Sequence, residues 1–302
     1  MVRLSVNVNK VATLRNSRGG NEPCLIQVVE DLIQFGAWGI TLHPRPDGRH
    51  ILYQDVRDIA QCVQKFPSVE LNIEGYPSEN FLDLIEETRP HQCTLVPDPP
   101  SALTSDQGWD LEDQFSFLEK VLGFLKKNKV RSSVFIDPLC FNLSALQKLC
   151  PDRVEFYTGK WAKTFDHIRQ KETPSLDNVK HRKSALSSIP SSSAQQSRLA
   201  PHYFAPAKAG IQKTVLQSET NGGIALNKEC LKILETYKTA SEQISKLGIG
   251  INAGHDLNQQ NLKPLIERVP LVQEVSIGHA LISEALYDGL KLTLEHYHRL
   301  LK

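Results

Sequence analysis

The chain has 302 residues, of which 35 are Lys or Arg and 34 are Asp or Glu, so its formal net charge is +1. Apolar residues make up 40% and charged residues 23%, close to the values of globular proteins, which excludes wholesale disorder and collagen-like repeats. The near-neutral total argues against broad electrostatic binding of nucleic acid or an anionic membrane. The length suits one large domain or two average ones.

Short β-branched runs alternate with amphipathic helical patterns, which is typical of repeated βα units. The pattern predicts strands at 4–9, 39–43, 69–75, 93–97, 132–137, 153–159, 248–255 and 274–280. It predicts helices between them at 23–35, 55–66, 81–89, 110–129 and 142–150, and one closing helix at 282–301. Asp55 is the candidate N-cap of the second helix, and the helix at 110–129 has acidic residues in its first turn.

Eight strand candidates in one βα array predict an α/β fold, a TIM-type (β/α)8 barrel, with residues 1–302 as a single domain. An open doubly wound sheet would alternate in the same way. However, such a sheet often carries a G-x-G-x-x-G turn after its first strand, and this sequence has none.

One stretch, residues 166–222, breaks the βα pattern after the sixth strand. Nine of its 57 residues are Ser, and it holds eight basic and four acidic residues, a net charge of +4, which leaves −3 for the rest of the chain. We interpret it as a low-complexity, largely disordered insertion at the rim of the barrel. It is either a spacer without function or a lid or partner-binding segment.

Cysteine spacing and the N-terminus indicate the compartment. The six cysteines are irregularly spaced and form no Cys-x-x-Cys pair, which favours reduced thiols over a disulfide framework. The first residues lack the apolar core of a signal peptide, and no stretch is long enough to span a membrane. We therefore expect a cytoplasmic protein with no membrane or nucleic-acid partner.

Polar side chains occupy the carboxyl ends of most predicted strands, where barrel enzymes hold their active sites. The candidates are Asn7, Asn9, His43, Arg45, His50, Glu74, Asp137, Glu155, Asn252, Gly254, His255, Gly278 and His279. Each has a plain alternative: a structural histidine for His43 or His255, a buried ion pair for Glu74, and loop capping for Asp137. Their common position at one rim favours a shared site.

The charges in these loops indicate the ligand. Arg15, Arg18, Arg45 and Arg49 lie in the first two predicted βα loops, and arginine suits phosphate oxygens. The loops after strands 7 and 8 are a frequent phosphate site in this fold. Two separated anion regions suggest one doubly phosphorylated substrate or two phosphorylated substrates, with histidine and glutamate moving protons between them. No Cys/His cluster has convincing zinc spacing, and we expect neither metal nor cofactor.

The motifs resemble the pyridoxine 5′-phosphate synthase family of the deoxyxylulose-dependent vitamin B6 pathway. They occur in order as N-x-N-x-V-A-T-L-R-N-S-R-G-G, G-I-T-L-H-P-R-P-D-G-R-H-I, N-I-E-G, L-V-P-D, F-I-D-P, V-E-F-Y-T-G, N-A-G-H-D-L-N and S-I-G-H-A. The resemblance covers nearly the whole chain outside 166–222. It implies a homo-octamer of transferase-class barrels that condense 3-amino-2-oxopropyl phosphate with 1-deoxy-D-xylulose 5-phosphate into pyridoxine 5′-phosphate, phosphate and water.

The resemblance also implies roles for residues. His43 and Glu74 match the proton acceptors, His255 matches the proton donor, and Glu155 matches a residue that stabilises the transition state. The deoxyxylulose phosphate contacts match Asn9, Lys10, Arg45, His50 and Thr104, and the amino-ketone phosphate contacts match Asn7, Arg18, Asp256, Gly278 and His279.

The chain departs from the family pattern at three places. Asn9-Lys10 stands where the family usually has Asp-His, Asp256 where Gly is common beside a phosphate site, and Tyr157 where His is usual. These departures keep two alternatives to the synthase open. One is a related phosphate-binding barrel enzyme with an altered substrate, and the other is a catalytically weak barrel that acts as a binding protein through its basic insertion.

Overall fold

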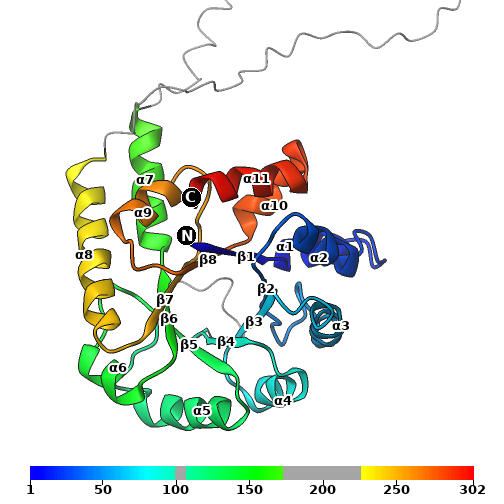
Figure 1. The fold of residues 1–302 in the computed structure, drawn as a ribbon, viewed down its shortest axis with the longest axis horizontal. Helices are drawn as coiled ribbons and strands as arrows, with labels where there is room; N and C mark the ends of the chain where they lie inside the picture. Colours follow the sequence, from blue (N-terminus) through cyan, green and yellow to red (C-terminus); the bar gives the residue numbers. More distant parts are fainter. Residues whose placement is uncertain (99–106, 173–225) are drawn as a thin grey trace, which may run out of the picture.

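The computed structural model describes residues 1–98, 107–172 and 226–302. The strands of these residues are parallel and close into one barrel, each paired with the next in the chain and β8 with β1 (Figure 1). They are β1 (Arg3–Asn7), β2 (Gly39–Leu42), β3 (Glu70–Gly75), β4 (Gln92–Leu95), β5 (Arg131–Ile136), β6 (Arg153–Tyr157), β7 (Gly250–Gly254) and β8 (Glu274–Ile277). The predicted (β/α)8 barrel is confirmed.

The helices surround the barrel (Figure 1). They are α1 (Asn9–Asn16), α2 (Leu25–Gln34), α3 (Tyr53–Val63), α4 (Glu79–Thr88), α5 (Phe115–Lys127), α6 (Leu143–Leu149), α7 (Gly159–Glu172), α8 (Lys228–Ser245), α9 (Leu262–Arg268), α10 (His279–Asp288) and α11 (Leu290–Leu300). Each amphipathic helix buries one apolar stripe, as α2 does with Leu25, Val29 and Leu32. No helix in these ranges is both long and apolar enough to span a membrane.

The strand residues alternate between the helices and the barrel interior, which explains the alternating strand sequences. In β1 and β2, Leu4, Val6, Ile40 and Leu42 belong to the hydrophobic core and are at most 1% exposed. The intervening residues are polar and bond to one another inside the barrel. The hydroxyl oxygens of Ser5 and Thr41 are 2.7 Å apart, and the Thr94 hydroxyl donates to the Asn72 side chain at 3.0 Å. Below the strand ends, the barrel interior is therefore lined by polar side chains that bond to one another.

Two helix boundaries differ from the sequence prediction, one at the start of α5 and one between α10 and α11. The predicted helix over 110–129 begins only at Phe115, because the Asp110 carboxylate accepts the backbone N–H groups of Glu112 and Asp113 and forms a turn instead. The single helix predicted over 282–301 is two helices, α10 and α11, which meet at Gly289. The positive φ of Gly289, 80°, is a conformation that glycine adopts without strain.

Asp55 is the third residue of α3 rather than its N-cap. Its carboxylate accepts the backbone N–H of Leu52 at 2.8 Å, so it closes the start of the helix from within the first turn. α1 is not among the predicted helices, since the pattern places Arg15 in a loop after the first strand.

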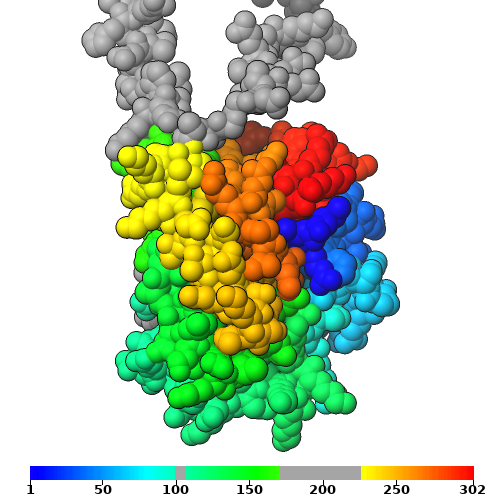
Figure 2. All heavy atoms as spheres, turned by 60° about the vertical axis from the view of Figure 1, so that its left-hand side comes forward, coloured from blue at the N-terminus to red at the C-terminus, as the bar shows by residue number. Residues whose placement is uncertain are grey.

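The segment predicted as an insertion follows β6, between α7 and α8. Residues 166–172 of it form the end of α7, and residues 173–222 lie outside the described residues. The extent of the insertion stays a prediction. Figure 2 shows α8 and α9 side by side on one face, with the N-terminal strand next to the C-terminal helices, as the β1–β8 pairing requires.

Candidate active site

A cavity of about 660 Å³ opens at the carboxyl ends of the strands. It brings together most of the predicted site residues: Asn7, Asn9, Lys10, His43, Arg45, His50, Glu74, Glu155, His255, Asp256, Gly278 and His279. A larger hollow of about 780 Å³ lies around Arg3 and Arg153, at the opposite end of the strands, and none of the predicted groups line it. We therefore take the smaller cavity as the candidate active site, because the predicted site residues line it.

Several predicted residues are not part of this cavity lining, among them Asn252 and Gly254 of β7. Arg18 follows the end of α1 and is exposed, and Thr104 lies outside the described residues. Asp137 is also absent from the lining. Its carboxylate accepts the backbone N–H of Leu139 at 2.9 Å and pairs with Lys160 at 2.8 Å, which fits the alternative that it caps its loop.

His43 and Glu74 form a close pair at the ends of β2 and β3. The Nδ1 atom of His43 lies 3.8 Å from Oε2 of Glu74, and the Asn7 amide donates to the same oxygen at 3.5 Å. Burial, and then the charge of Asp98, raise the pKa of Glu74 to about 8. Burial, and then the charge of Arg45, lower the pKa of His43 well below its usual value. At neutral pH the pair therefore consists of a neutral imidazole, able to accept a proton, beside a carboxyl group that largely retains its own.

Glu155 is a second buried carboxyl group on the cavity wall. Its pKa is raised well above the usual value by burial and then by the charge of Glu74. A Cβ atom on Gly254 would lie 2.2 Å from Oε1 of Glu155, so the glycine of the N-A-G-H motif leaves room for this carboxyl group. Several carboxyl groups that favour the protonated form near neutral pH can give and take protons during a reaction.

Asn9 links the first two strand ends. Its backbone N–H donates to the Asn7 side chain at 3.0 Å, and its own Oδ1 accepts the backbone N–H of His43 at 3.0 Å. An aspartate in this position would accept the same hydrogen bond. The departure at residue 9 therefore preserves the structural role and removes only a negative charge.

The basic side of the cavity is formed by the loop after β2. The Arg45 guanidinium pairs with the buried Asp98 carboxylate at 2.7 Å. The His50 Nδ1 atom accepts the backbone N–H of Ile51 at 2.9 Å, which leaves Nε2 as the nitrogen that carries the ring proton when His50 is neutral. Burial, and then the charge of Arg45, lower the pKa of His50 to about 4, so the ring is neutral at physiological pH.

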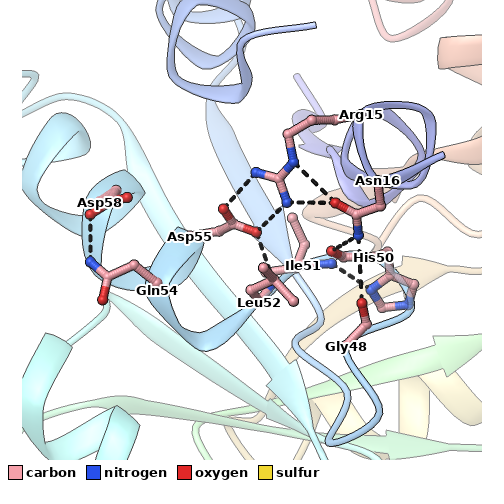
Figure 3. Close-up of polar contacts among 9 residues, drawn as sticks. All are labelled: Arg15, Asn16, Gly48, His50, Ile51, Leu52, Gln54, Asp55 and Asp58. Carbon is pink, nitrogen blue, oxygen red and sulfur yellow. Dashed lines mark hydrogen bonds and ion pairs between the residues drawn. The ribbon is translucent and has the colours of Figure 1, made fainter. Parts of the chain in front are cut away.

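Arg15, expected to contact phosphate, has a different role. Its guanidinium forms two hydrogen bonds with the Asp55 carboxylate, at 2.6 and 2.8 Å, and both side chains are buried (Figure 3). It also holds Asn16, whose amide donates to the backbone carbonyl of His50 at 2.8 Å. Arg15 therefore stabilises the loop that carries His50 through Asn16, without lining the cavity itself.

The opposite side of the cavity contains one cation that the sequence analysis missed. Lys163, on α7, lines the cavity with Asp256 and His279. No motif marks it. Its position in the first turns of the helix after β6 places it at the rim, and that position was the available signal.

Comparison with known proteins gives consistent matches over the full chain. The family model described as pyridoxal phosphate biosynthesis protein PdxJ matches residues 4–190 and 205–302. A pyridoxine 5′-phosphate synthase of Flavobacterium johnsoniae is 39% identical over 302 residues, covering 100% of both chains. One of Bacteroides thetaiotaomicron is 40% identical over 304 residues with the same coverage.

Solved structures with very different sequences share the fold. A thiamine phosphate pyrophosphorylase from Pyrococcus furiosus has a TM-score of 0.50 at 8% identity, over 99% of this chain and 95% of that one. A phosphoribosyl anthranilate isomerase from Thermus thermophilus has a TM-score of 0.50 at 10% identity, over 99% and 98%. At such low identity these likenesses concern the barrel alone.

Proposed function

This chain belongs to the PdxJ family of pyridoxal phosphate biosynthesis proteins, and we propose that it is a pyridoxine 5′-phosphate synthase. It would condense 3-amino-2-oxopropyl phosphate with 1-deoxy-D-xylulose 5-phosphate and release phosphate and water. The observation that carries the proposal is the pairing of His43 with Glu74 in a cavity that Glu155 and His255 also line. Ring closure through an imine, with loss of phosphate and water, moves a proton at each step, and these groups suit that task.

We assign the proton-accepting steps to His43 and Glu74 and proton donation to His255. Neutral His43 accepts a proton and Glu74 exchanges one, because their pKa values are displaced from the ordinary values in opposite directions by burial. Glu155, protonated in its buried position, would donate a hydrogen bond to the oxygen on which charge develops.

The two phosphates would bind at opposite sides of the cavity. Arg45, His50 and the Asn9-Lys10 pair line the side proposed for the deoxyxylulose phosphate. The contact proposed for Thr104 lies outside the described residues. The side proposed for the amino-ketone phosphate holds Asn7, Asp256, Gly278 and His279. The contact proposed for Arg18 would have to come from an exposed side chain outside the lining. His279 is the first residue of α10, so backbone N–H groups at the start of this helix favour an anion there.

The direct test is to mix the purified full-length protein with both phosphorylated substrates and follow pyridoxine 5′-phosphate by absorbance or fluorescence. We expect product to form only when both substrates are present. Folded protein that gives no product above the protein-free control would contradict the synthase and favour the related enzyme with an altered substrate.

We also propose that the protein is cytoplasmic and assembles as a homo-octamer. The α10–α11 pair presents Leu286 and Tyr287 with 72% and 92% exposure, an apolar surface that association would cover. Light scattering on the purified protein should give eight times the chain mass of 33.9 kDa, and Tyr287→Glu should reduce it. A wild-type protein that is monomeric at micromolar concentration would contradict the assembly.

A further inference from the structure

The turn after β7 places two neighbouring ionisable side chains in contact. His255 and Asp256 have φ values of 86° and 56°, both in the left-handed region that residues other than glycine rarely adopt. In an extended strand, successive side chains point to opposite faces. Here the turn brings Nδ1 of His255 to 3.1 Å from Oδ2 of Asp256.

This unusual backbone is held from both sides. The Thr158 hydroxyl donates to the carbonyl of Gly254 at 2.7 Å and also bonds to the carbonyl of His255. The Asn261 amide donates to the carbonyl of Asp256 at 3.0 Å. A left-handed conformation at two consecutive residues persists only when its surroundings fix it, and such strain gathers at functional sites.

Charged and aromatic side chains from neighbouring elements surround the His255–Asp256 pair. The pKa of Asp256 is lowered, first by its close contact with His255 and then by the charges of Lys163 from α7 and His279 from α10. Glu155 lies next to Gly254, and the Tyr157 ring meets the His255 ring edge-on at 5.1 Å. The Asp256 carboxylate is therefore charged and lies within 3.1 Å of the imidazole, with Lys163 nearby to offset its charge beside the proposed phosphate site.

We propose that Asp256 is a positioning residue that holds His255 in the tautomer with the proton on Nδ1, so that Nε2 is the nitrogen that transfers a proton to the substrate. The catalytic consequence rests on the proposed synthase function, whereas the tautomer does not. In the transfer step, the Nε2–H bond of the imidazolium breaks and its proton joins the departing oxygen, which keeps the electron pair of the breaking C–O bond. The ring is left neutral with its remaining proton on Nδ1, where the Asp256 carboxylate accepts it.

The test measures the tautomer and the kinetics in the full-length protein. Asp256→Gly keeps a residue that accepts the left-handed backbone but removes the carboxylate, and Asp256→Asn keeps both the backbone preference and an oxygen acceptor. Nitrogen-15 spectra of the histidine rings at alkaline pH, with the His255 signals identified by their loss in His255→Gln, give the tautomer of each protein. Circular dichroism and thermal unfolding check that each variant is folded.

We expect the Nδ1–H tautomer in the wild type and in Asp256→Asn, and a shift toward Nε2–H in Asp256→Gly. In the synthase assay, kcat of Asp256→Gly should fall by about tenfold, a fraction of what a general acid contributes. Its KM for the amino-ketone phosphate should not rise, because removal of a carboxylate does not weaken the binding of an anion.

Two results would overturn the inference. One is an unchanged Nδ1–H tautomer in folded Asp256→Gly. The other is a raised KM with an unchanged kcat, which would make Asp256 a substrate contact instead. If the wild type forms no pyridoxine 5′-phosphate, the proposed function fails while the spectra still decide whether Asp256 sets the tautomer.

Discussion

Replacing Glu74 by Gln is expected to lower kcat by about 10²- to 10⁴-fold, the usual contribution of a general acid or base. The glutamine oxygen keeps the shape of the side chain and can still accept the Asn7 amide, but it can neither give nor take a proton near neutral pH. The synthase assay measures the effect. Glu79→Gln, which changes an exposed residue in the first turn of α4, is the matched control and should leave kcat unchanged.

Thermal unfolding separates this effect from misfolding, because the pKa of Glu74 is raised on folding. A raised pKa means that the stability contribution is fully present below the ordinary value of 4.5 and is lost as the pH rises through about 8. Glutamine has no such dependence. The Tm of Glu74→Gln should therefore rise relative to that of the wild type between these pH values. Parallel Tm profiles for the two proteins, or an active variant, would contradict the role of Glu74.

The barrel could be predicted because eight short β-branched runs alternate with helical patterns along the chain. Leu4 and Val6 face the helices while Ser5 and Asn7 face inward, and the same rule places His43 and Glu74 at the inner rim. Since parallel strands bring their carboxyl ends to one side, a list of strand-end residues is already an approximate map of the site. The sequence thus located the site without resolving which groups touch.

The errors in the sequence prediction arise where side chains, rather than periodicity, decide the backbone. The predicted loop that contains Arg15 is the helix α1, and Arg15 turns inward to Asp55, a partner 40 residues away that no local pattern reveals. Gly289 interrupts an unbroken helical pattern through its positive φ. Lys163 was missed because the helix after the sixth strand carries no motif, and its role depends on the three-dimensional position of Asp256.

The His255–Asp256 contact is a further feature that the local sequence pattern does not predict. In the sequence, Asp256 is a departure that places a negative charge beside a phosphate site. In the fold, the left-handed turn directs that carboxylate to the imidazole of its neighbour, 3.1 Å away. A residue that seems to oppose substrate binding can therefore serve the proton-transfer step, because backbone conformation determines which atoms its charge reaches.

Removing one partner of the buried Arg15–Asp55 ion pair should destabilise the protein strongly. Arg15→Met leaves the Asp55 carboxylate buried without its partner, and such a change typically lowers the free energy of unfolding by about 3–5 kcal/mol. Urea denaturation measures it. As a matched control, Arg57→Met breaks the exposed pair with Glu87, whose side chains are 35% and 51% exposed, and should cost less than about 1 kcal/mol.

The double variant Arg15→Met with Asp55→Asn tests the cause of that loss. Asparagine removes the stranded charge while its oxygen still accepts the backbone N–H of Leu52, so α3 keeps its N-terminal hydrogen bond. We expect the double variant to be more stable than Arg15→Met alone, because an unpaired buried charge costs more than a neutral polar group. Equal stability of the two variants would show that lost packing of the arginine stem, rather than the uncompensated carboxylate, destabilises the protein. In either case Asn16 loses its guanidinium contact, so the KM for the substrate bound beside His50 should rise in both variants.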